Sequence, residues 1–72
     1  MNNVEQQMQT AETYAVESDH QADRLAKVVE HLRQHGQPTS TAEDRQGRFI
    51  AMARAYRERR NQLEAKLKGR NE

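Results

Sequence analysis

The stretch His35-Gly36-Gln37-Pro38-Thr39-Ser40 decides how this chain folds, because it interrupts an otherwise continuous helical pattern. Glycine adopts the left-handed conformation that ends many helices, and proline cannot continue one. Glu43 follows Ser40 by three residues, the spacing at which a hydroxyl and a carboxylate cap the start of a helix reciprocally. The sequence therefore predicts one helix that ends before Gly36 and a second helix that begins at Ser40.

Before this turn, a heptad pattern of mostly apolar residues extends back to the start of the chain. Spacings of three and four residues alternate without a slip, whereas a half-buried strand would alternate every second residue. The pattern predicts a helix over about residues 3–34. Its seam positions are Met1, Val4, Met8, Ala11, Ala15, Ser18, Ala22, Leu25, Val29 and Leu32.

After the turn, a second heptad pattern predicts a helix over about residues 40–68. Its seam positions are Ala42, Gln46, Phe49, Ala53, Tyr56, Arg60, Leu63 and Leu67. Gly47 is a weak point inside this helix, since glycine costs about 1 kcal/mol relative to alanine. Either the first turns are loose or another backbone approaches there. We expect frayed ends near residues 1–2 and 69–72.

The short connection predicts that the two helices pack antiparallel. Residues 1–38 carry a net charge of −3, from six acidic and three basic residues, and residues 39–72 carry +4, from nine basic and five acidic residues. An acidic helix would thus face a basic one, which favours this pairing. We predict an all-α fold, a two-helix antiparallel hairpin that forms a single domain over residues 1–72.

Polar side chains in the middle of the seam are expected to fix its register. Antiparallel pairing places Ser18 opposite Tyr56 and Ala15 opposite Arg60. We expect the Tyr56 ring to lie in the seam with its hydroxyl near Ser18 or the rim. Arg60 would extend past Ala15 toward Glu12 or Asp19, because a slipped register would leave its charge without a partner.

One hairpin offers only about fifteen core side chains larger than alanine. Their burial alone does not clearly compensate for the conformational entropy lost when the chain folds. A second, shorter apolar stripe lies outside the seam, and it consists of Tyr14, Ala26, Val28, Ile50, Ala51 and Met52. We expect this stripe to join two hairpins as a homodimer, a four-helix bundle. The alternative is a marginal monomer that orders only on a partner.

Composition excludes several classes of protein. The chain has 72 residues, a net charge of +1 and no cysteine, which removes disulfides, cysteine-based zinc sites and thiol nucleophiles. No apolar run approaches the roughly 20 residues that span a bilayer, and residues 1–10 lack the features of a signal peptide. We expect a cytoplasmic protein with no membrane partner.

Few residues suggest catalysis or metal binding. His31 and His35 have a spacing at which two imidazoles can share a metal, and Glu30 is adjacent, but His20 lies more than two turns away and Glu43 across the turn serves equally well as a helix cap. The carboxylate pairs at 17/19 and 43/44 have no apolar pocket around them of the kind found in active sites. We predict no catalytic residue, no metal site and no cofactor, and therefore a protein that is not an enzyme.

The most distinctive functional feature is the concentration of basic residues in the second helix. Arginine, aromatic and methionine side chains dominate the energetics of protein interfaces. We predict a small regulator that binds another protein as an inhibitor, adaptor or anti-activator, of a size common among phage and plasmid proteins. The predicted partner-binding residues are Tyr14, Val28, Ile50, Met52, Arg54, Arg57 and Arg59.

The alternative is a helical dimer that binds RNA or DNA through the second helix. A dimer would double the basic face and place it along a phosphate backbone. The residues in this interpretation are Arg57, Arg59, Lys66, Lys68 and Arg70. A membrane surface fits less well, because this face lacks a bulky apolar stripe that would insert.

Overall fold

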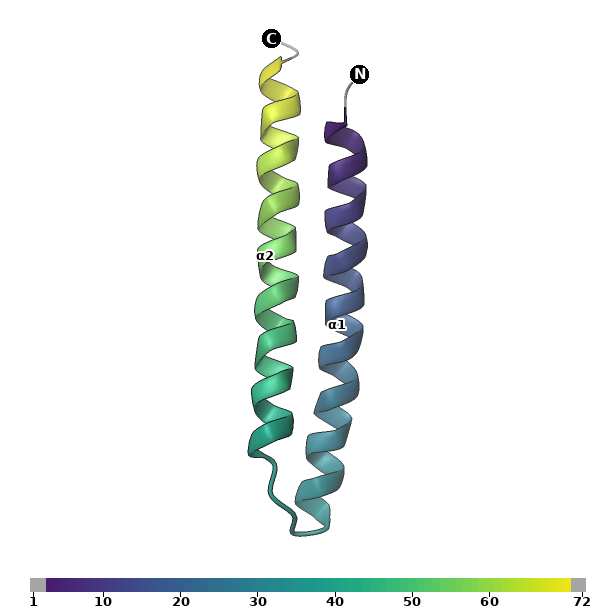
Figure 1. The fold of residues 1–72 in the computed structure, drawn as a ribbon, viewed down its shortest axis with the longest axis vertical. Helices are drawn as coiled ribbons and strands as arrows, with labels where there is room; N and C mark the ends of the chain where they lie inside the picture. The colour runs from purple at the N-terminus through teal and green to yellow at the C-terminus, as the bar shows by residue number, and fades with distance from the viewer. Residues whose placement is uncertain (1–2, 71–72) are drawn as a thin grey trace.

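The computed structural model describes residues 3–70, and their side chains through residue 69. Helix α1 spans Val4–Gln34 and helix α2 spans Ser40–Arg70. The two helices lie side by side and antiparallel, so that the start of α1 and the end of α2 are at the same end of the molecule (Figure 1). The predicted all-α hairpin is therefore confirmed.

Gly36 ends α1 as the sequence predicts. Its φ is +66°, in the left-handed region, and residues 37–39, which belong to neither helix, lead from it into α2. The backbone N–H of Gln37 donates to the carbonyl of Leu32 at 2.8 Å, and the N–H of Gly36 donates to the carbonyl of Arg33 at 3.1 Å. These two bonds form the Schellman arrangement, which satisfies carbonyls that would otherwise lack partners at the helix end.

The start of α2 differs by one residue from the predicted cap. Ser40 is already helical, and the residue before it, Thr39, closes the first turn by accepting the N–H of Glu43 on its carbonyl at 2.9 Å. The Thr39 hydroxyl also donates to the Glu43 carboxylate. The predicted pairing of Ser40 with Glu43 is thus wrong, because the carboxylate turns back to the hydroxyl that lies one full turn before it.

Both seams follow the predicted heptads. The buried positions are mostly small residues, namely Ala11, Ala15, Ser18, Ala22, Val29, Ala42, Ala53 and Leu63. The remaining predicted seam residues within 4–67, including Phe49 and Tyr56, are half-buried. Small residues in the centre allow the two backbones to approach closely, which leaves the larger side chains at the edges of the seam.

The end of α2 extends beyond its predicted limit at residue 68. The helix continues through Gly69 to Arg70, while residues 1–2 and 71–72, where we expected fraying, lie outside the described residues. Gly47 lies within regular helix, and a Cβ added there would meet no atom within 4 Å. Neither looseness nor close approach of α1 therefore accounts for this glycine. Within residues 3–70, neither helix carries an apolar stretch long enough to cross a membrane.

Candidate protein-binding surface

Two tyrosines, one from each helix, form the most prominent feature on one side of the hairpin. The ring centroids of Tyr14 on α1 and Tyr56 on α2 are 5.3 Å apart, and the ring planes are tilted by 49°. This geometry is favourable for an aromatic pair. Tyr56 is half-buried in the seam as predicted, and Tyr14, which is 46% exposed, lies against it from outside.

Open hollows flank this tyrosine pair on both sides. One, of about 460 Å³, lies toward the start of α1 and is lined by Asn3, Gln6, Gln7, Thr10, Ala11, Tyr14, Tyr56 and Arg59. The other lies toward the middle of the hairpin, where Met52 and Phe49 join the two tyrosines. We call this side the aromatic flank and define it by Tyr14, Phe49, Met52, Tyr56 and Arg59.

The helical repeat extends the aromatic flank along the hairpin. Residues seven apart in a helix lie on nearly the same face. Val28 follows Tyr14 by two heptads, so it belongs to this flank, and it is 44% exposed. Arg45 precedes Met52 by one heptad, and Lys66 follows Arg59 by one heptad. The apolar centre of the flank thus has basic residues at both ends.

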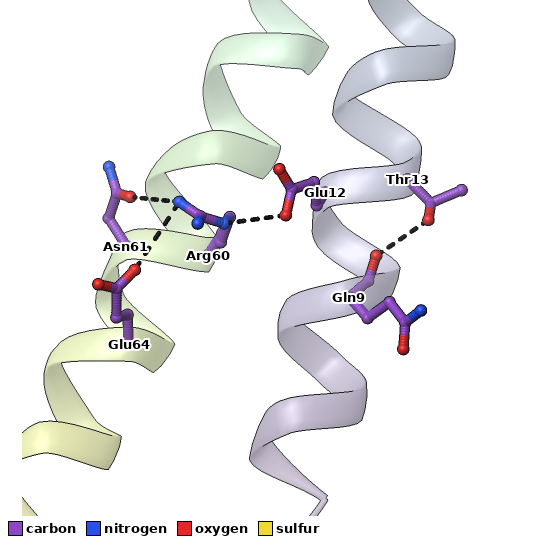
Figure 2. A network of polar contacts seen from close by, with 6 residues as sticks. All are labelled: Gln9, Glu12, Thr13, Arg60, Asn61 and Glu64. Carbon is purple, nitrogen blue, oxygen red and sulfur yellow. Dashed lines mark hydrogen bonds and ion pairs between the residues drawn. The ribbon is translucent and has the colours of Figure 1, made fainter.

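The opposite side of the hairpin is held by ion pairs between the helices. The guanidinium of Arg57 lies against the carboxylate of Asp19. Figure 2 shows Arg60 of α2 reaching toward Glu12 of α1, with its Nε 3.2 Å from the Glu12 carboxylate and its Nη1 3.8 Å from that of Glu64. We call this side the ion-pair flank and define it by Glu12, Asp19, Arg57, Arg60 and Glu64.

The contact between Arg57 and Asp19 changes the acidity of both groups. The hydrogen bond from Arg57, together with its positive charge, holds the pKa of Asp19 below its ordinary value. The same hydrogen bond and the Asp19 charge raise the pKa of Arg57. Both side chains are about half exposed, so this pair contributes more to the pairing of the helices than to stability.

The structure separates the predicted apolar patch into two parts. Tyr14, Val28 and Met52 lie on the aromatic flank. Ile50 precedes Arg57 by one heptad and therefore lies on the ion-pair flank, where it is 43% exposed. All four side chains are exposed, as predicted, but a single flat partner cannot contact all of them.

The predicted basic patch is divided in the same way. Arg59 lines a hollow of the aromatic flank, whereas Arg54 and Arg57 line another hollow together, on the outer side of α2. The guanidinium of Arg57, a predicted partner-binding residue, pairs with Asp19 across the helices. Helix geometry explains this result, since residue 57 lies one turn before residue 60, the position predicted to form the ion pair.

The residues of the nucleic-acid alternative are also dispersed. Arg57 is paired with Asp19, and the Lys68 ammonium lies 3.2 Å from the Glu64 carboxylate. Arg59 and Lys66 share the aromatic flank. The side chain of Arg70 lies outside the described side chains.

The candidate chemical groups do not assemble into a site in the part of the chain that the structure describes. The rings of His31 and His35 are 4.4 Å apart, but no group of three or more potential metal ligands occurs among residues 3–69. Asp19, one of the paired carboxylates, is held by Arg57. Because Arg57 stabilises the ionised form of this carboxylate, Asp19 is poorly suited to take up a proton.

Sequence reasoning missed two features of this surface. Val16 counted among the possible core side chains, whereas it is 44% exposed and lines a hollow with Glu12 and Arg57 on the ion-pair flank. Sequence reasoning also did not separate the two flanks, although the heptad positions on either side of each seam carry this information. No protein-family model, curated protein or solved structure matches the chain.

Proposed function

We propose that this chain is a small cytoplasmic, non-enzymatic regulator that acts as an inhibitor or adaptor by binding another protein through its aromatic flank. The observation that carries this proposal is the exposed Tyr14–Tyr56 pair, with Met52 on one side and Arg59 on the other. Tyrosine, methionine and arginine are enriched in the buried centres of interfaces.

The scaffold of the aromatic flank also supports a binding role. Its side chains project from two long, regular helices, and the two tyrosines are already packed against each other. Side chains that are ordered before binding lose less conformational entropy in the complex. The surface therefore needs little rearrangement to accept a partner.

Nucleic acid is the second candidate, and the exposed Arg59 and Lys66 beside two tyrosines favour it. Two observations weigh against it. Arg57 and Lys68 are engaged by carboxylates, and the tyrosine rings pack on each other at 5.3 Å, too close to admit a base between them. Affinity for RNA or DNA would fall steeply with salt, whereas an interface anchored by Tyr14 and Met52 would lose little affinity.

Self-association into a four-helix bundle remains a separate prediction, and the ion-pair flank suits it better than the aromatic flank. Val16 and Ile50 are exposed there. Acidic residues predominate on α1 and basic residues on α2, so a two-fold arrangement would lay the α1 of each copy against the α2 of the other. Sedimentation equilibrium of Ile50→Gln against wild type tests this arrangement, and an unchanged dimer mass would contradict it.

Capture of a partner from lysate tests the binding proposal. The test variant carries Tyr14→Gln, Met52→Gln and Arg59→Gln, and the matched control carries Val16→Gln, Ile50→Gln and Arg54→Gln. We expect wild type and the control to retain the same nuclease-resistant protein and the test variant to lose it. Equal retention by both variants would contradict the proposal, and capture that nuclease abolishes would favour the second candidate.

A further inference from the structure

We infer that the partner segment that covers the aromatic flank is an amphipathic helix with acidic residues along the edges of its apolar face. This inference rests on the proposed function and goes further by naming the chemistry of the partner. It follows from the charge, the apolar spacing and the length of the flank, and the first two of these properties also weigh against two other occupants.

The charge of the aromatic flank is strongly positive, although the whole chain has a net charge of only +1. On this flank and its outer edge, the heptad positions carry five basic residues and one acidic residue, Glu17, a net charge of +4. The five are Arg24, Arg45, Arg48, Arg59 and Lys66, all exposed.

These cations are available to a partner, and the opposite side is not similarly charged. The ion pairs among residues 3–69 involve Arg57, Arg60 and Lys68, and not the five cations of the aromatic flank. The ion-pair flank and its outer edge carry seven acidic and five basic residues, a net charge of −2. An acidic partner would thus be attracted electrostatically to the aromatic flank and repelled by the ion-pair flank.

The apolar residues of the flank match a helical partner. Tyr14 and Val28 are two heptads apart on α1, and Met52 lies on α2 between the positions opposite them. From the hollow beside Gln7 to Val28 the surface is roughly 30 Å long, at 1.5 Å per residue. An amphipathic helix that lies along this surface can place a residue from every turn against it.

Two other occupants fit the flank less well. Met52 and the half-buried Phe49 offer nothing to phosphates, and yet they line the hollow at the centre of the surface. A second copy that docks through the same flank would bring a net charge of +4 against +4, which is repulsive. An acidic amphipathic helix satisfies both the apolar centre and the basic margins.

Synthetic peptides of about 21 residues, enough to cover the flank, test this inference directly. The first peptide has leucine on one helical stripe with glutamate on both sides of it. The second has lysine in place of glutamate, and the third has the composition of the first in an order that destroys the stripe. Binding is measured by titration calorimetry and by amide chemical shifts of the ¹⁵N-labelled hairpin at about 100 mM salt, where steering by exposed charges is partly screened.

We expect only the first peptide to bind and to shift the amides around Tyr14, Met52 and Arg59. Val28→Gln and Met52→Gln should weaken its binding about tenfold or more. The matched controls Val16→Gln and Ile50→Gln, with similar exposures but on the ion-pair flank, should retain the wild-type affinity. Arg45→Glu and Arg59→Glu should weaken the first peptide and strengthen the second. These exposed positions leave the fold intact, which circular dichroism checks.

Four outcomes would overturn the inference. One is failure of the first peptide to bind. Another is binding of the lysine peptide at the aromatic flank with the same affinity as the glutamate peptide. This result would contradict the acidic character of the partner but not the proposed function. The third is displacement of the first peptide by mixed-sequence RNA that shifts the same amides. The last is a dimer mass in sedimentation that Met52→Gln reduces to a monomer, because a second copy would then occupy the flank.

Discussion

The guanidinium of Arg57 on α2 faces both carboxylate oxygens of Asp19 on α1, and this two-point contact joins the helices near the middle of the hairpin. A two-point contact with a carboxylate fixes the direction as well as the distance of the arginine side chain. The contact therefore helps to set which turn of α1 lies against which turn of α2.

The Asp19 carboxyl is expected to titrate below the ordinary aspartate range because Arg57 stabilises its charged form. Since the pKa is lower in the folded than in the unfolded chain, the contribution of this pair is present above about pH 4 and is lost as the pH falls through the folded pKa. Carboxyl NMR titration should show the Asp19 pKa returning toward its ordinary value in Arg57→Gln. The control, Arg54→Gln, should leave this pKa unchanged, and an equal rise in both variants would argue against the contact.

The two tyrosines are expected to differ in their contribution to stability. Tyr56 is half-buried in the seam, so Tyr56→Ala should cost about 3 kcal/mol, enough to unfold much of so small a domain. Tyr14 lies against it from outside, and Tyr14→Ala should cost about 1 kcal/mol, the value of the aromatic contact. Urea denaturation followed by circular dichroism measures both. Near-native stability of Tyr56→Ala would mean that α2 is rotated from the register described above.

The fold could be predicted from the sequence because its determinants are local and repetitive. The heptad spacings specify the buried side of each helix, and Gly36 with Pro38 specifies the turn. The exact cap was harder to predict, because Thr39 and Ser40 carry the same hydroxyl and only the path of the backbone decides which one meets Glu43.

The surface could be predicted only in part, because exposure is a local property but the choice of flank is not. Tyr14, Val28, Ile50 and Met52 were all expected to be exposed, and they are. Their division between two flanks depends on small angular offsets from the seam and on how the second helix is rotated against the first. The partner of Arg57 followed from the same offsets and was likewise missed.

Arg60 is expected to contribute to the specificity of the helix pairing more than to its stability. It lies half-buried at a seam position and reaches Glu12 and Glu64 at the surface. Replacing a partly buried charge with an apolar side chain of similar reach is often neutral or stabilising. Arg60→Leu should therefore melt at or above the wild-type temperature while its amide resonances broaden as alternative registers become populated. A loss of more than about 1 kcal/mol would instead assign the ion pairs a stabilising role.

Two glycines are expected to respond in opposite ways to alanine. Gly36 has a φ of +66°, which alanine adopts only with strain, so Gly36→Ala should destabilise the hairpin by about 1 kcal/mol. Gly47 is helical and a Cβ there would meet nothing within 4 Å, so Gly47→Ala should stabilise it by about 0.5–1 kcal/mol. Urea denaturation at low protein concentration measures both effects.

Gly47→Ala also reports on self-association, because its added methyl would obstruct a second copy whose backbone approaches at that point. A Gly47→Ala protein that is more stable when dilute but dissociates more readily in sedimentation would locate the contact between copies at this turn. Equal dissociation of Gly47→Ala and wild type would place any such contact elsewhere.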